Sequence, residues 1–184
     1  MRDEALTAAI EEHRDYLDQL SFLVRELDPE AYRLVDGPHG RYCIGKHLRH
    51  ILDHCWAVLH ASGSRIDYEQ RDRNSLVESS PHAALESLAA LREGFDAWVA
   101  DRSGGETVSV QWQDTSGEVI TARSSLIREV LFLSSHAVHH MAVIAMIVRQ
   151  RGLELPPEFG LATSTRRYWA AQTDDEARKQ ATPA

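Results

Sequence analysis

Hydrophobic residues recur at steps of three and four along four stretches of the chain, with polar residues between them. This spacing places the apolar side chains on one face of an α-helix. In the first stretch, for example, the stripe begins at Leu6 and continues to Leu27. The pattern therefore predicts four amphipathic helices, over residues 3–27, 44–62, 81–101 and 126–151.

Residues that typically begin or end helices stand at the edges of these stretches. Ser80 and Pro81 form a favourable cap and first helical residue for the third helix. Ser124 or Ser125 can cap the fourth helix, and Gly152 follows its last residue as a typical stop. These signals support the predicted helix ends.

The segments between the predicted helices differ in pattern. Residues 28–41 and 63–80 lack periodicity and are expected to be surface connections. Apolar and polar residues alternate over 107–112 and 118–121 around a turn at 114–117, which predicts a short β-hairpin. Two strands alone are marginally stable in water, so we expect the hairpin to pack against the helices.

The end of the chain carries weaker signals. We expect a nonhelical tail over 155–160, a short helix near 165–172 and a frayed end over 173–184. Residues 1–184 are thus expected to form a single domain of the all-α class. Its four helices and long connections predict a four-helix bundle with at least one crossover connection and a small β-hairpin between the third and fourth helices.

Composition and charge narrow the range of partners. The chain is 43% hydrophobic, and 20 Lys and Arg against 28 Asp and Glu give a net charge of −8, which repels nucleic acid and anionic membrane surfaces. The first residues do not resemble a signal peptide, and no uninterrupted apolar run approaches the roughly 18 residues of a membrane span. We therefore expect a cytoplasmic protein that binds neither nucleic acid nor membranes, with Cys43 and Cys55 as unpaired thiols.

Histidines are concentrated in two of the predicted helices. In the fourth helix, His136 and His140 are four residues apart and share one face, at a separation that lets two imidazoles meet one metal ion. His139 lies at the edge of the apolar arc and is a weaker candidate. The fourth helix therefore predicts a pair of metal ligands that needs a third from elsewhere.

The second helix carries a row of three histidines that could supply this ligand. His47, His50 and His54 follow one another at steps of three and four. A helical wheel places His47 and His54 closer to the apolar arc than His50, so spacing alone leaves the choice open. The alternative is that the histidines are hydrogen-bonded core residues, although several buried imidazoles without a metal would each need partners for both ring nitrogens.

Three histidine ligands with one open position define a catalytic rather than a structural metal site. Such an ion lowers the pKa of a bound water or thiol and so provides a nucleophile near neutral pH. Glu129 and Asp53 are isolated acids, so the carboxylate-rich motif of a di-iron bundle is missing from the sequence. The pattern also lacks the elbow motif of a serine hydrolase.

Two segments resemble the DinB-like proteins, a large and mostly bacterial group of four-helix bundles that includes S-transferases using bacillithiol or mycothiol. Residues 44–53, Ile-Gly-Lys-His-Leu-Arg-His-Ile-Leu-Asp, are similar to the second-helix motif, and His136-x-x-His139-His140 is similar to the fourth-helix motif. The resemblance implies that His50, His136 and His140 bind a divalent metal, nickel or zinc. His47 remains the alternative to His50.

The resemblance leaves the remaining histidines and the substrate open. His47, His54 and His139 could surround the ligands or relay a proton. Where many members continue His-Arg-Gly-Gln after the last ligand, this chain has His140-Met141-Ala142-Val143, so their substrate specificity does not transfer directly.

Three functions follow from these patterns. The first is a metal-dependent enzyme that transfers a low-molecular-weight thiol to a small-molecule substrate or hydrolyses a bond. The second is a noncatalytic stress-response protein that binds a metal or a small ligand. The third is a bundle with structural histidines that dimerises through an outer helix face, and we expect a homodimer.

Overall fold

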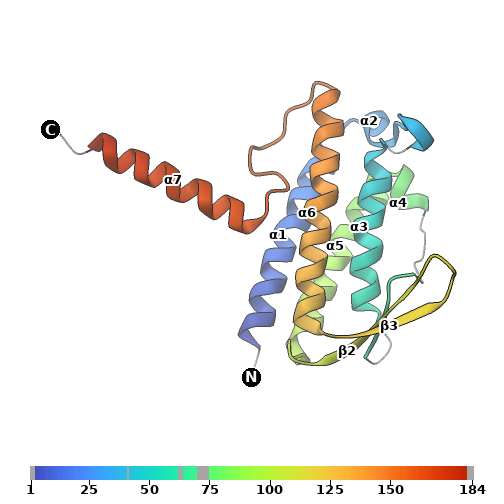
Figure 1. Cartoon of the computed structure of the whole chain (residues 1–184). Helices are drawn as coiled ribbons and strands as arrows, with labels where there is room; N and C mark the ends of the chain where they lie inside the picture. Colours follow the sequence, from blue (N-terminus) through green and yellow to red (C-terminus); the bar gives the residue numbers. More distant parts are fainter. Residues whose placement is uncertain (1–2, 41, 62–63, 70–74, 182–184) are drawn as a thin grey trace.

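The computed structural model describes residues 3–40, 42–61, 64–69 and 75–181. The chain is mostly helical, with a small sheet at one end of the long helices (Figure 1). All four predicted helices are present, with ends that differ from the predictions by a few residues. They are α1 (Glu4–Glu26), α3 (Ile44–Leu59), α5 (Pro81–Trp98) and α6 (Leu126–Gln150).

These four helices pack into what we call the helical body. α1 packs against α5 and α6, and α3 packs against the same two helices. α1 and α6 run in one direction while α3 and α5 run in the other, so the end of α3 and the start of α5 lie at opposite ends of the body (Figure 1). Fully buried apolar side chains from all four helices form the core, among them Leu17, Leu48, Phe95 and Met141.

The predicted caps hold the body helices at their beginnings. Ser80 accepts a hydrogen bond from the backbone of Ala83 and caps α5, and Pro81 is the first residue of that helix. Of the two serines considered for α6, Ser125 is the cap, and its side chain accepts a bond from the backbone of Arg128. Each cap satisfies a backbone donor that the helix itself cannot.

The predicted hairpin is confirmed, and it belongs to a larger sheet. β2 (Thr107–Gln113) pairs antiparallel with β3 (Val119–Ser125), and β1 (Arg65–Asp67) pairs parallel with β2. The prediction of a two-stranded hairpin in an otherwise all-α chain is therefore corrected to a three-stranded sheet. β1 forms because Ile66 is completely buried beside Val108 and Val110, so the strand joins the core.

Two segments predicted as surface connections contain short helices. Within 28–41 the structure forms α2 (Pro29–Arg33) and a 3-10 turn, η1 (Pro38–Gly40), and within 63–80 it forms α4 (Ser75–Ser79) besides β1. A second 3-10 turn, η2 (Val99–Asp101), extends α5. Residue 62 at the end of the predicted second helix, and residues 41, 63 and 70–74 of the predicted connections, lie outside the described part of the chain. Helices of five residues are too short to show a recognisable apolar period.

α2 and α4 pack closely against the start of α3. The buried hydroxyl of Tyr32 in α2 donates a 2.5 Å hydrogen bond to the backbone carbonyl of Val77 in α4. A side chain at Gly45, in the first turn of α3, would collide with the carbonyl oxygen of Glu78. The glycine in the histidine-rich segment therefore allows two backbones to approach.

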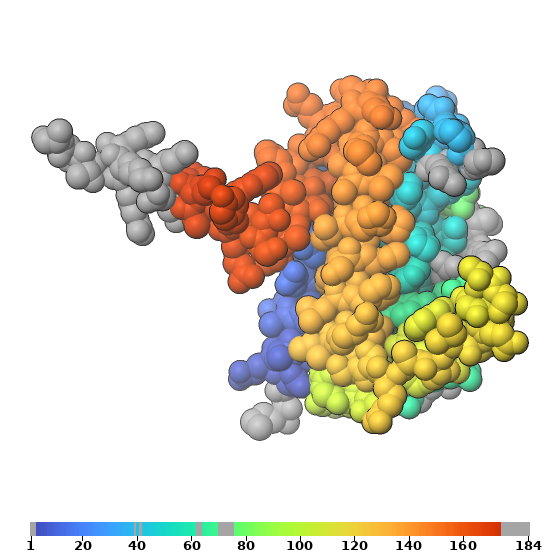
Figure 2. All heavy atoms as spheres, viewed as in Figure 1, coloured from blue at the N-terminus to red at the C-terminus, as the bar shows by residue number. Residues whose placement is uncertain are grey.

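The C-terminal helix α7 (Thr163–Ala181) is longer than predicted and projects away from the helical body (Figures 1 and 2). Its first turns are held to α1, since Thr163 donates a 2.7 Å bond to Glu12 and Arg166 a 2.6 Å bond to Asp15. The frayed end predicted for 173–184 is thus helical as far as Ala181. The sequence predicted only the part of this helix near 165–172, because α7 lacks an apolar stripe that would mark its full length.

α6 is long and apolar enough, by length and composition alone, to cross a membrane, with a mean hydropathy of 1.7 over its most apolar window. The same property is typical of a core helix. α6 packs between α1 and α3, where its buried side supplies Val130, Leu133 and Ala137 to the core. It is the element that carries the second group of histidines.

Candidate metal centre

α3 and α6 run antiparallel and bring their histidines together. The ring of His50 lies 4.8 Å from that of His136 and 4.7 Å from that of His140, between centroids. One nitrogen from each of the three histidines can be chosen so that all lie within 4.8 Å of one another, and all three side chains are partly buried. The three histidines that the resemblance selects therefore form one cluster.

The chemistry of this cluster fits a divalent metal ion. Ligand nitrogens around a tetrahedral ion stand about 3.4 Å apart, so modest ring rotations suffice to close the cluster on an ion. The Nε2 atom of His136 is buried and has no hydrogen-bond partner among the described residues. A buried polar atom left unpaired costs about 1–3 kcal/mol, and coordination would satisfy it.

The surroundings keep two of these three imidazoles, His136 and His140, uncharged. Burial, reinforced by the neighbouring His54 and His140, lowers the pKa of His136 from 6.5 to about 3. Burial and the nearby His47 lower the pKa of His140 to about 4. Both rings are therefore neutral at physiological pH, and protons do not compete with a metal for their lone pairs.

His47 holds His140 through a direct contact between their rings. The two Nδ1 atoms lie 3.0 Å apart, which requires a proton on one of them. Coordination by Nε2 of His140 requires that its own Nδ1 carry this proton and donate it to His47. His47 then fixes both the tautomer and the orientation of His140 by accepting that hydrogen bond.

The two remaining histidines differ in burial. His54 is only 8% exposed, in agreement with the helical wheel, and its Nδ1 lies 2.9 Å from the carbonyl oxygen of His50. Nδ1 therefore carries the proton, and the ring stacks on His136 with centroids 4.1 Å apart. His139 is exposed, and its ring lies 5.0 Å from that of His140. His54 therefore belongs to the wall of the cluster, and His139 to its rim.

Two aromatic residues complete this wall, and neither was predicted from the sequence. Tyr68, next to β1, stacks on His54 at 5.2 Å between centroids, and Phe132 of α6 lies 5.6 Å from His136. Phe132 stands one turn before His136, a signal that could have been read. Tyr68 lay in a segment predicted to be a surface connection, although its alternation with Ile66 is the spacing of a strand.

The two acids that looked isolated in the sequence are both engaged. Glu129 is completely buried and accepts hydrogen bonds from Tyr68 at 2.6 Å, from Arg128 at 2.8 Å and from Ser124. Asp53 is paired with Arg49 at 2.7 Å. These pairings leave neither carboxylate as an obvious base beside the three histidines.

Besides His54, a second buried histidine lies away from the cluster, in the core of the helical body. His13 of α1 is completely buried, with Nε2 3.2 Å from the sulfur of Cys55 and Nδ1 3.4 Å from the hydroxyl of Ser134. Burial lowers the pKa of His13 to about 4 and raises the pKa of the Cys55 thiol. Cys55 and Cys43 are both free thiols, as predicted. The pKa shifts of His13 and Cys55 leave these two residues uncharged near neutral pH.

Comparison with known proteins adds information on ancestry. A family model described as the DinB family matches residues 1–175. The chain is similar to a protein named FK506-binding protein 5 from Rhizopus delemar, with 33% identity over 101 residues. That match covers 54% of this chain and 26% of the relative, so the chain spans about a quarter of the relative's length. No solved structure matches the chain.

Proposed function

The chain belongs to the DinB family, and on this premise we propose that it binds a divalent ion, nickel or zinc, through His50, His136 and His140 and transfers a small thiol. The observation that carries this proposal is the cluster of three histidines, two of them held neutral, with a buried and unpartnered nitrogen on His136. Three imidazole ligands leave the charge of the ion uncompensated and a coordination position open.

An ion bound by three neutral ligands lowers the pKa of a coordinated thiol, so that its sulfur is nucleophilic at neutral pH. The nucleophile is more readily a thiol than water, because the acidic residues near the cluster are already engaged. Glu129 and Asp53 are both held in ion pairs, so neither is placed to activate water as hydrolysis requires. A thiol needs less help because its own pKa lies closer to neutrality.

The surrounding side chains would support this transfer. His47 orients His140, while Tyr68 and Phe132 shield the cluster from water on one side. Because Nδ1 of His54 donates to the carbonyl of His50, Nε2 is the atom of this ring that would accept the proton that the thiol loses. In the transfer, a sulfur–carbon bond forms, the bond from that carbon to its leaving group breaks, and the leaving group departs with the bonding electrons.

Membership of the family also suggests how the helices are arranged and what the protein assembles with. We propose that the four long helices form the four-helix bundle of this family, with the crossover between α3 and α5. A cytoplasmic homodimer acting on a small molecule, without nucleic acid or membrane partners, remains our expectation.

The proposal is tested by turnover of protein purified without a histidine tag and loaded with nickel or zinc. Mercaptoethanol serves as thiol and chlorodinitrobenzene as electrophile, and release of the coloured thioether is compared for the wild type, H136A and H82A. His82 is an exposed histidine on α5 and provides the matched control. We expect metal-dependent turnover in the wild type and H82A that is lost in H136A. A metal-bound protein without turnover would instead support the noncatalytic binding function.

A further inference from the structure

A continuous row of side chains leads along α6 to the candidate metal centre. Arg128, Phe132, His136 and His140 follow one another at steps of four and so lie on one side of the helix. The guanidinium carbon of Arg128 lies 5.3 Å from the ring of Phe132, which lies 5.6 Å from the ring of His136. Arg128 thus stands at the far end of this row.

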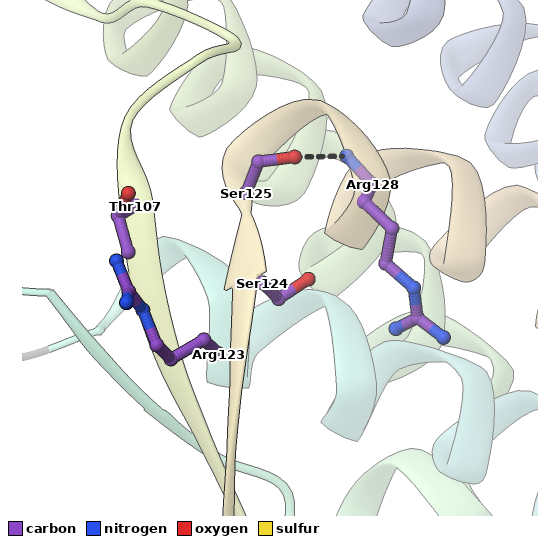
Figure 3. Close-up of a pocket in the computed structure, with 5 residues that line it drawn as sticks. All are labelled: Thr107, Arg123, Ser124, Ser125 and Arg128. Carbon is purple, nitrogen blue, oxygen red and sulfur yellow. Dashed lines mark hydrogen bonds between the residues drawn. The ribbon is translucent and has the colours of Figure 1, made fainter.

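A pocket of about 410 Å³ opens at this end of α6 (Figure 3). It is lined by Thr107, Arg123, Ser124, Ser125 and Arg128. The backbone donors of the helix are already taken there, because the N–H groups of residues 126, 127 and 128 bond to Glu106, Gly104 and Ser125. A ligand in this pocket would therefore meet side chains rather than a free helix terminus.

The guanidinium of Arg128 is held in place but remains accessible. It donates a 2.8 Å hydrogen bond to Glu129, which is completely buried, while the Arg128 side chain itself is 62% exposed. A guanidinium has five N–H donors, so most of them stay available to another acceptor. In Figure 3, Arg123 lies on the opposite side of β3, so Arg128 is the cation on the side of the helices.

We propose that Arg128 is a specificity-determining residue that binds a carboxylate or phosphate at the far end of an elongated substrate. This inference rests on the proposed function, because the reacting end of that substrate would lie at the three histidines. The separation of eight positions from Arg128 to His136 corresponds to about 12 Å along the helix axis. The exposed part of Phe132 lies between them and offers an apolar contact to the middle of the molecule.

The opposing interpretation is that Arg128 only neutralises the buried Glu129. The two roles differ in one respect: only a residue that contacts the substrate distinguishes a charged ligand from a neutral one of the same length. Arginine pairs well with planar carboxylates and with phosphates. A series of ligands that differ only at their far end therefore separates the two roles.

The experiment uses the full chain loaded with cobalt, whose thiol complexes absorb visibly. Mercapto acids from mercaptoacetate to mercaptoundecanoate are titrated against the mercapto alcohols of equal length, and dissociation constants are read from the sulfur-to-cobalt charge-transfer band. We expect the acid to bind roughly fivefold more tightly than the alcohol at lengths that span the row, and equally at intermediate lengths, which are too long for the carboxylate to chelate the cobalt and too short to reach Arg128.

Three variants assign this preference to Arg128. Because R128Q alone would leave the carboxylate of Glu129 short of a partner, the test variant is R128Q/E129Q, and E129Q serves as its matched control. The double variant leaves the net charge unchanged, and R149Q, which removes an exposed arginine from the other end of α6, controls for the loss of one positive charge at a distant site. The preference should disappear in R128Q/E129Q and persist in E129Q and R149Q. Equal binding of acid and alcohol by the wild type, or an unchanged preference in the double variant, would overturn the proposal.

A second measurement does not depend on the metal. In metal-free protein, the Nε–H resonance of Arg128, assigned by its loss from R128Q, should shift with the long mercapto acids and not with the alcohols. Absence of the cobalt band with every ligand would count against the proposed function. In that case the resonance titration of the metal-free protein would still test the role of Arg128 by itself. If the Arg128 resonance does not respond to the long mercapto acids, the proposed role of Arg128 is refuted.

Discussion

Acid should destabilise this protein through His13, a buried residue outside the candidate metal centre. Burial lowers the pKa of His13 to about 4 in the folded chain, while in the unfolded chain it returns to about 6.5. Below pH 6.5 the unfolded state therefore binds a proton that the folded state excludes. Stability is fully present above pH 6.5 and falls as the pH drops towards 4. A difference of about 2.5 pH units corresponds to about 3 kcal/mol.

The variant H13Q isolates this contribution, because its amide keeps hydrogen-bonding capacity towards Cys55 and Ser134 but does not titrate. Urea unfolding is followed by circular dichroism between about pH 7.5 and pH 4.5, with a chelator present so that metal binding plays no part. Other groups titrate in both proteins and cancel in the difference. We expect the wild type to lose about 2–3 kcal/mol more than H13Q over this range. Parallel curves for the two proteins would refute the reasoning.

Three further predictions concern the neighbours of the histidine cluster and the packing of α3. H47A should weaken metal binding by about 10–100-fold in a competition titration with a coloured chelator and leave the stoichiometry unchanged, whereas lost stoichiometry would make His47 a ligand. Y68F should lower the free energy of unfolding by about 1–3 kcal/mol, because the buried Glu129 loses a donor, and an unchanged urea midpoint would contradict this. G45A should be clearly destabilising because its methyl group meets the backbone carbonyl of α4, whereas G94A meets only a flexible leucine side chain, and equal thermal midpoints for the two would contradict the packing described.

The long elements were predictable because each repeats its signal many times. α6 repeats its apolar period over 25 residues and has a capping serine at its start, so both its existence and its beginning could be read from the sequence. β1 has three residues, and its burial depends on a partner strand about forty residues later in the chain. α7 lacks the apolar stripe by which a helix is recognised. Elements whose stability comes from distant contacts carry too little local signal to be predicted from the sequence.

The same distinction applies to the site. His136 and His140 could be paired by spacing alone, because both lie on one helix. The choice of His50 over His47 depends on how α3 faces α6, which a helical wheel does not contain, and it came from the family resemblance. Tyr68 joins the histidines only through the sheet, and its link to Glu129 spans 61 positions in sequence. Contacts of that kind follow from the fold.

The most direct test of the account is the metal content of the chain, purified without a histidine tag and measured by elemental analysis together with protein concentration. The account predicts about one nickel or zinc ion per chain, near-complete loss in H50A, H136A and H140A, and unchanged content in H82A. A wild type without stoichiometric metal that is not stabilised by added nickel or zinc would contradict it. Equal metal content in the wild type and the three ligand variants would contradict it as well.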